Sequence, residues 1–237
     1  MITSDDETAK KRLFTAGMLP LFGVIMLACL FVLDRTFELG LDRFGLRPMN
    51  ARGALGILTA PLIHGSVSHL VDNAIALLVL GWCLVYFYPK AAGRVVAWTW
   101  LLGGTLVWLT ARHDMHIGAS GVLYGMAAFL FFSGVIRKQR TLMAVSLIVV
   151  FLYGGLVWGV FPILPAMSWE SHFWGGVVGT ALAWWLRDVA PAHLPKPIVF
   201  EEEAGAPSIV YDIDPGDEDP GSRRSSGTLD PDRTDIA

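Results

Sequence analysis

The residues best suited to chemistry in this chain are one serine and a small set of histidine and asparagine side chains in apolar segments. Ser120 stands at the head of a long apolar run. The other members come from two further apolar segments and are His64, His69, Asn73 and His172. Buried polar groups are costly in a bilayer and usually face a bundle interior or a water-filled cavity. Their grouping therefore indicates nucleophilic catalysis inside a membrane.

Acyl transfer needs a nucleophile, a base and hydrogen-bond donors for the oxyanion, and each can be assigned here. Ser120 can attack a carbonyl carbon, and His172 can take its proton. His69 and Asn73 lie four residues apart on one helix face and can donate to the oxyanion. The backbone N–H of Ser120 can do the same, because the first turn of a helix lacks intrahelical acceptors. Tyr124 lies on the same helix face as Ser120, one turn further on.

The composition is that of a membrane domain followed by an acidic tail. The chain has 237 residues, of which 54% are apolar, and a mean hydropathy of +0.52. Residues 1–187 carry 14 Lys/Arg and 9 Asp/Glu, whereas residues 188–237 carry 4 and 12. The tail is rich in Pro, Gly, Ser and Asp and lacks the apolar content to fold alone. We expect a short cytoplasmic N-terminus (1–13), a membrane domain (14–187) and a disordered acidic cytoplasmic tail (188–237).

Six apolar segments are long enough to cross a bilayer as helices, which places the chain in the all-α membrane class. The predicted spans are 14–33, 69–88, 94–110, 118–136, 141–161 and 170–186. The long connection 34–68 contains semi-apolar stretches and is expected to have structure of its own. No cofactor or metal is expected, and no nucleic acid is expected as a partner.

Basic residues give this six-span arrangement an orientation. Nine of the fourteen in the membrane domain fall on the side of the N-terminus, which the positive-inside rule makes the cytoplasm. Both termini are then cytoplasmic. His69, Ser120 and His172 fall at the outer starts of their spans. His64 lies just before the second span and Asn73 one turn deeper in it, so the whole set is expected on the outer side at similar depth.

Glycines predict close packing between the fourth and sixth spans. Gly121 and Gly125 are four residues apart, and so are Gly175 and Gly179. Small residues at this spacing let helix backbones approach closely. The serine and histidine helices are therefore expected to lie side by side.

Three motifs in this order resemble a rhomboid intramembrane serine protease, in the six-helix form common in bacteria. The matching residues are His64, His69 and Asn73 on the second span, Gly118-Ala119-Ser120-Gly121 with Tyr124 on the fourth, and His172, Gly175, Gly176 and Gly179 on the sixth. The similarity covers roughly residues 14–187. Two departures are the lack of the family's Trp-Arg pair in 34–68 and the presence of Asp72, where the family usually has an apolar or small residue.

The resemblance implies a function and a role for each residue. Ser120 and His172 would form a catalytic dyad without an acidic third member, with His69 and Asn73 at the oxyanion. His64 would be a structural support, and Tyr124 would pack against the His172 ring. The substrates would be transmembrane segments of single-span proteins, cleaved near the outer side of the cell membrane after lateral entry near the fifth span.

The same residues allow other interpretations. Ser120 could serve only to pack helices, and the polar set could belong to a transporter, although its polar residues stop near the outer third. His64 and His69 lack the His-Glu-x-x-His spacing of a metalloprotease, and no strand precedes Ser120 as in a Gly-x-Ser-x-Gly hydrolase. His113 and His116 form a loop pair that is expected to be solvated rather than to bind metal. Asp72 and Glu170 could each orient a histidine, act as a helix cap or lie on the surface.

Overall fold

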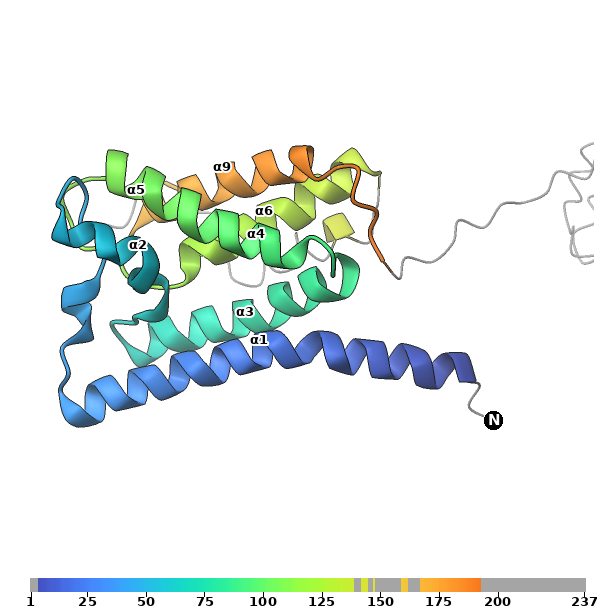
Figure 1. Ribbon diagram of the computed structural model, residues 1–237, viewed down its shortest axis with the longest axis horizontal. Coiled ribbons are helices and arrows are strands. Elements are labelled where there is room, and N and C mark those ends of the chain that lie inside the picture. Colours follow the sequence, from blue (N-terminus) through green and yellow to red (C-terminus); the bar gives the residue numbers. More distant parts are fainter. Residues whose placement is uncertain (1–3, 139–141, 145–146, 148–158, 162–166, 193–237) are drawn as a thin grey trace, which may run out of the picture. The chain divides into compact units, whose positions relative to one another are not determined.

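The computed structural model describes residues 4–138, 142–144, 147, 159–161 and 167–192. Within these ranges every regular element is helical, as the composition predicts. The elements are α1 (Ser4–Phe37), η1 (Leu41–Phe44), η2 (Arg52–Leu55), α2 (Gly56–Thr59), η3 (Ala60–Leu62), α3 (Val67–Phe87), α4 (Ala92–Trp98), η4 (Thr99–Gly103), α5 (Gly104–Thr110), α6 (Ser120–Ile136) and α9 (Trp169–Trp185). The starts of α3, α6 and α9 lie at one end of this bundle (Figure 1).

Three of the described helices are long and apolar enough to cross a membrane. They cover Glu7–Phe37, Val67–Phe87 and Ala92–Thr110, and α6 is a shorter apolar helix. The third combines α4, η4 and α5, where η4 is a π-helical turn within a continuous helix. The predicted span 170–186 corresponds to α9, and most of the span 141–161 lies outside the described residues. The count of six spans stays a prediction.

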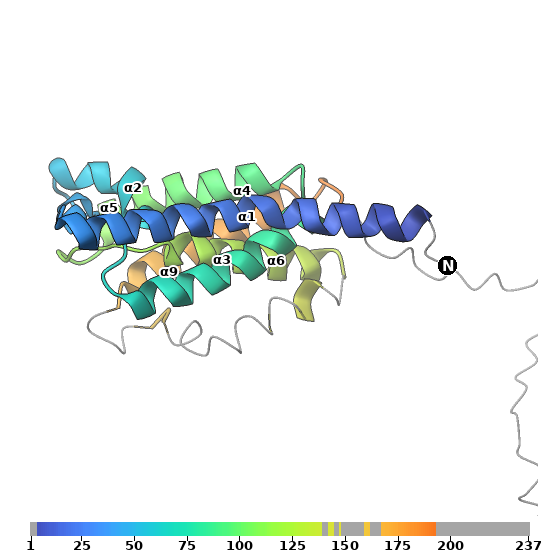
Figure 2. The same ribbon diagram turned by 90° about the horizontal axis from the view of Figure 1, so that it is seen from below.

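Helix α1 begins well before the predicted span, because its charged N-terminal segment is also helical. Its 34 residues extend about 50 Å, more than the roughly 30 Å of a hydrocarbon core. It lies beside α3 in both ribbon views (Figures 1 and 2). The indole of Trp82 donates to the carbonyl of Leu13 at 2.8 Å, and its ring lies against Gly17. Pro20 packs against Gly81 in the same way.

The long connection before α3 has structure of its own, as expected, and is tied to the α4–α5 helix. The indole of Trp100 donates to the carbonyl of Ile57, and that of Trp108 to the carbonyl of Asn50, each at 3.0 Å. The backbone N–H of Met49 returns a bond to the carbonyl of Trp108 at 2.9 Å. These bonds fix short helical turns over the end of the bundle where α6 and α9 begin.

Helix α6 is the most buried element among those described. Leu123, Met126, Phe129 and Leu130 are at most 1% exposed and belong to one core cluster shared with α3, α4 and α9. Helix α9 lies along α6, and the glycines meet as the spacing predicts. A Cβ added to Gly175 or Gly179 would overlap the carbonyl oxygen of Gly121 or Gly125, respectively. We call this line of glycine contacts the glycine seam.

The far end of the same helix pair is held by one arginine. Arg137 follows α6 and donates to the carbonyls of Leu186 and Val189 at the end of α9, at 2.8 and 3.0 Å. It also bonds the hydroxyl of Ser133, and its guanidinium lies over the Tyr88 ring. This arginine therefore ties the end of α6 to the C-cap of α9 and to the backbone that follows it.

Candidate active site

Ser120 and His172 form a hydrogen-bonded pair at the start of their helices. The Oγ of Ser120 lies 2.7 Å from Nε2 of His172. The other ring nitrogen, Nδ1, lies 2.8 Å from the carbonyl oxygen of Gly159. A carbonyl can only accept, so Nδ1 carries the hydrogen and the neutral ring leaves Nε2 free to accept from the serine hydroxyl. The tautomer is therefore the one that a general base for Ser120 requires.

The imidazole plane is restrained by an aromatic neighbour. The ring of Tyr124, one turn below Ser120 on α6, stacks on the ring of His172 with centroids 4.1 Å apart and planes 7° from parallel. His172 is 6% exposed and Tyr124 9%. Stacking and the Gly159 carbonyl together leave the histidine ring little freedom to turn away from Ser120.

His69 and Asn73 stand beside the loop that leads into Ser120. The hydroxyl of Ser66 caps α3 by accepting from the backbone N–H of His69 at 3.1 Å, which fixes where the helix begins. The amide nitrogen of Asn73, a side chain that is 4% exposed, donates to the carbonyl of His69 at 2.9 Å. Both side chains thus belong to one well-defined turn.

Gly118 explains how this turn comes so close to Ser120. Its φ of 107° lies where residues with a Cβ are strained. A Cβ there would also collide with Nε2 of His69 and would lie 3.6 Å from the amide nitrogen of Asn73. The backbone N–H of Gly118 donates to the carbonyl of Ala60 at 2.8 Å, which holds the loop in place. Glycine at this position lets the two donors approach the backbone just before Ser120.

His64 lies behind His69 and is buried. Its side chain is 3% exposed, and the two imidazole rings meet edge to face with centroids 5.0 Å apart. Within the described part of the chain neither ring nitrogen has a hydrogen-bond partner of normal geometry. Burial, and to a lesser degree the charge of His69, lowers the pKa of His64 to about 4. The ring is therefore neutral at pH 7 and acts as a packing surface for His69.

One sequence-based expectation about the outer loop needs correction. His113 is exposed, as expected, but His116 is only 3% exposed and bonds Ser168 through Nδ1. The loop looked solvated because its neighbours are polar, whereas the start of α9 covers this histidine. Glu170 is 5% exposed and does not orient His172; its Oε1 lies 3.6 Å from Nε of Arg112.

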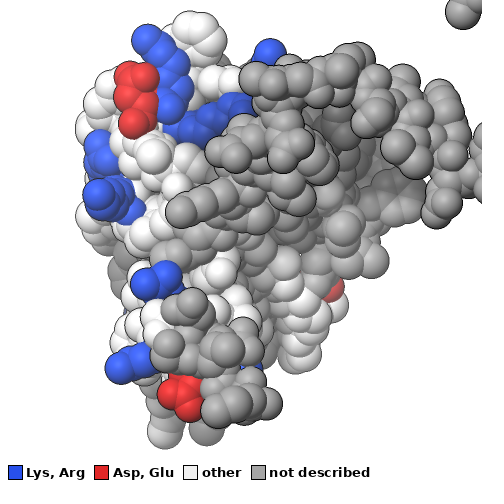
Figure 3. Space-filling view, turned by 90° about the vertical axis from the view of Figure 1, so that its right-hand side faces the viewer, with Lys and Arg blue, Asp and Glu red and all other residues white. Residues whose placement is uncertain are grey.

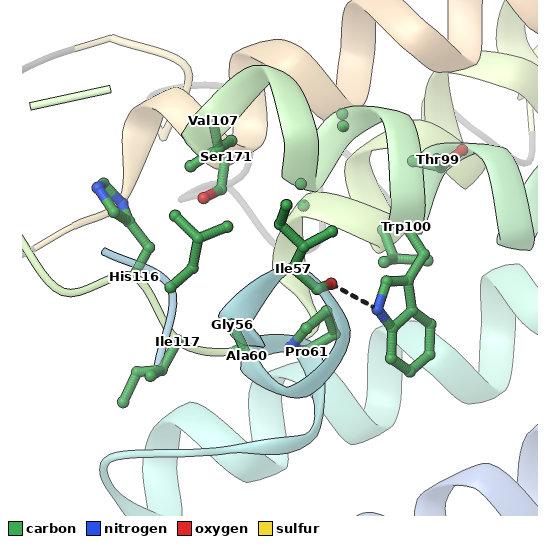
Figure 4. Close-up of a pocket in the computed structure, with 17 residues that line it drawn as sticks. Gly56, Ile57, Ala60, Pro61, Thr99, Trp100, Val107, His116, Ile117 and Ser171 are labelled. Atoms are coloured by element: carbon green, nitrogen blue, oxygen red, sulfur yellow. Dashed lines mark hydrogen bonds between the residues drawn. The ribbon is translucent and has the colours of Figure 1, made fainter. Parts of the chain in front are cut away.

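A small cavity lies on the other side of the glycine-rich start of α6. Its volume is about 40 Å³, and its walls come from α2, the π-helical turn η4 and the first turns of α6 and α9. Figure 4 shows His116 and Ser171 at one side of the cavity and Ile57 and Trp100 at the other. The indole of Trp100 donates to the carbonyl of Ile57 there.

The described residues contain no group of three or more His, Cys, Asp or Glu that could hold a metal ion.

Sequence reasoning missed two partners of the predicted residues. The acceptor for His172 is the backbone carbonyl of Gly159, and no side-chain pattern identifies such a group. The contacts of His116 with the start of α9 join segments 52 residues apart, so spacing within the loop could not reveal them. The sequence does hold one signal that the start of α9 has polar partners. Ser168 and Glu170 stand four and two residues before His172, and polar side chains at the start of a membrane helix need partners.

Comparison with known proteins identifies the family of this chain. Residues 51–189 match the rhomboid domain. Uncharacterized proteins of Mycobacterium bovis and Mycobacterium tuberculosis are each 33% identical over 194 residues, which cover 78% of this chain and 81% of the relative. An uncharacterized protein of Mycobacterium leprae is 31% identical over 214 residues, covering 86% and 83%. The chain belongs to the rhomboid family of intramembrane proteases.

Proposed function

We propose that this protein is a serine endopeptidase that cleaves transmembrane segments of single-span membrane proteins near the outer side of the cell membrane. The observation that carries the proposal is the 2.7 Å hydrogen bond between Oγ of Ser120 and Nε2 of His172, with Nδ1 bound to a carbonyl. A nucleophile, an adjacent base and a third group that orients the base are the arrangement expected for acyl transfer.

The reaction proceeds through an acyl-enzyme. The Oγ of Ser120 attacks the scissile carbonyl carbon while its proton passes to Nε2 of His172. Collapse of the tetrahedral intermediate breaks the C–N bond, and the same proton leaves with the amine. Water then attacks the ester carbonyl, His172 takes its proton, and that proton returns to Ser120 Oγ as the acid product departs.

The oxyanion is stabilised by donors around Gly118. The side chains of His69 and Asn73 lie beside this residue, and the backbone N–H of Ser120, the first of α6, has no intrahelical acceptor. Preorganised donors of this kind contribute roughly 10²- to 10³-fold each to the rate. Gly118 is needed because a Cβ would occupy the space in which these donors converge.

The distribution of charge supports an orientation with the dyad outside. Basic residues gather at the end of the described bundle opposite the dyad, where α1 begins and α3, α6 and α9 end (Figures 1 and 3). They are Lys10, Lys11, Arg12, Lys90, Arg94, Arg137, Lys138 and Arg187. Under the positive-inside rule this end faces the cytoplasm, and we propose that both termini lie on that side.

The test is cleavage of a single-span reporter protein with small or helix-breaking residues near the outer end of its span, co-reconstituted with the protein in liposomes. We expect cleavage in that region, located by mass spectrometry, and its loss in Ser120→Ala and His172→Ala. His113→Ala, a change of an exposed histidine outside the site, serves as the matched control. Undiminished cleavage by Ser120→Ala would refute the proposed function, and cleavage only at the inner end would refute the orientation.

A further inference from the structure

A second group of polar side chains lies just outside the dyad, between the loop before α6 and the first turn of α9. Its members are Arg112 and His116 from the loop and Ser168, Glu170 and Ser171 from α9. His116 and Glu170 are 3% and 5% exposed. Burial of polar side chains requires partners, and the proposed chemistry uses none of these residues.

The contacts form a directed chain of hydrogen bonds. Nε2 of His116 lies 3.3 Å from the carbonyl of Arg112, which can only accept, so in the neutral ring Nδ1 is an acceptor. Nδ1 bonds the hydroxyl of Ser168, whose oxygen lies 2.7 Å from the hydroxyl of Ser171. The serine hydroxyls therefore donate toward the histidine, and the chain ends on the loop backbone.

An ion pair runs parallel to this chain. Nε of Arg112 lies 3.6 Å from Oε1 of Glu170, and the other end of its guanidinium donates to the carbonyl of Met167 at 2.6 Å. The loop thus holds the start of α9 through both side chain and backbone. Glu170 also suits its place in the first turn, where a negative charge is favourable.

Ser168 shows that these contacts replace an ordinary helix cap. It occupies the N-cap position of α9, where serine usually accepts from a backbone N–H of the first turn. Its side chain makes no such bond and is directed to His116 and Ser171 instead. The position of the first turn of α9 therefore depends on the loop rather than on the helix itself.

We propose that His116 is a positioning residue, which through Ser168 fixes the first turn of α9 so that His172 meets Ser120. His116 precedes Ser120 by four residues, and Ser168 precedes His172 by four. One hydrogen bond therefore joins the segments that carry the nucleophile and the base, one turn before each of them. This inference rests on the proposed function.

The test compares two replacements of His116. In His116→Asn the side-chain amide lies near the place of Nδ1 and keeps a partner for Ser168, whereas His116→Leu fills the volume without hydrogen bonds. Two rates are measured on folded protein in detergent: phosphonylation of Ser120 by a small fluorophosphonate, which needs only the dyad, and kcat and KM for the reporter protein. His113→Leu is the matched control.

We expect His116→Leu to lower both kcat and the phosphonylation rate by roughly 10- to 100-fold with KM unchanged, because about 1 Å of misplacement costs up to 10²-fold. His116→Asn recovers most of the loss. Equal rates for His116→Leu and His113→Leu, or a loss of thermal stability alone, would overturn the inference. Should His116→Leu fail to fold, Ser168→Ala makes the same test. Failure of the unmodified protein to react would instead refute the proposed function.

Discussion

Replacement of Gly179 by alanine tests whether the glycine seam sets the geometry of the dyad. Gly179 lies two helical turns below His172, and its added Cβ would overlap the carbonyl oxygen of Gly125. A carbon and a carbonyl oxygen come no closer than roughly 3.3 Å, so α9 has to retreat from α6 by about 1 Å. Backbone cannot rotate aside as a flexible side chain can.

The expected magnitude follows from this displacement. Overpacking of this kind costs about 1–3 kcal/mol of unfolding free energy, which leaves most domains folded. A shift of about 1 Å between Ser120 and His172 lowers the rate by up to roughly 10²-fold. We therefore expect a large loss of activity in protein that is still folded.

The assay uses a control on the same helix. Gly176 has no atom within 4 Å of an added Cβ, so Gly176→Ala introduces the same methyl group into open space. Phosphonylation of Ser120 and cleavage of the reporter protein are measured for both variants, with thermal unfolding in detergent as the measure of stability. Rates for Gly179→Ala within twofold of those for Gly176→Ala would refute the reasoning about the seam.

Two further predictions concern stability. The pKa of His64 is about 4 in the folded protein against 6.5 for an exposed histidine. As the pH falls, this imidazole is therefore protonated in the unfolded chain before it is protonated in the folded protein. The unfolding free energy should fall by roughly 3 kcal/mol as the pH drops from 6.5 to 4, and less so in His64→Phe, as measured by denaturation across pH. Arg137→Met removes the guanidinium that donates to the carbonyls of Leu186 and Val189. It should lower stability by roughly 2–3 kcal/mol, against no change for the exposed neighbour in Lys138→Met. The same pH dependence of the unfolding free energy in His64→Phe and the unmodified protein would contradict the first assignment. Equal unfolding free energies for Arg137→Met and Lys138→Met would contradict the second.

Local patterns in the sequence predict much of the fold and the candidate site. The apolar runs give α3, the α4–α5 helix, α6 and α9 to within a few residues, because a membrane span is fixed by length and hydropathy. The glycine spacing predicts the α6–α9 contact, since only small residues permit it. The charged start of α1 was predicted to lie outside the helix, because charged residues do not belong in a bilayer. The segment is helical all the same, since charges outside the bilayer do not prevent helix formation.

What could not be predicted depends on contacts between distant segments. His116 is buried by the start of α9, although its own neighbours in the loop are polar. Arg137 looks like one of many inner basic residues until the end of α9 is placed beside it. The acceptor for His172 is the backbone carbonyl of Gly159. Every residue has such a carbonyl, so the residue types in a sequence do not reveal which one will accept.

That last contact has a consequence for genetics. A complete mutational scan, in which every residue is replaced in turn, finds partners through their side chains, and the Gly159 carbonyl survives most replacements at its position. Such a scan would find Ser120, His172 and the residues packed around them, but it would find no side chain that accepts from Nδ1 of His172. The His172 ring is nevertheless oriented by a third group, which evolution can move only by reshaping the backbone and not by exchanging a residue.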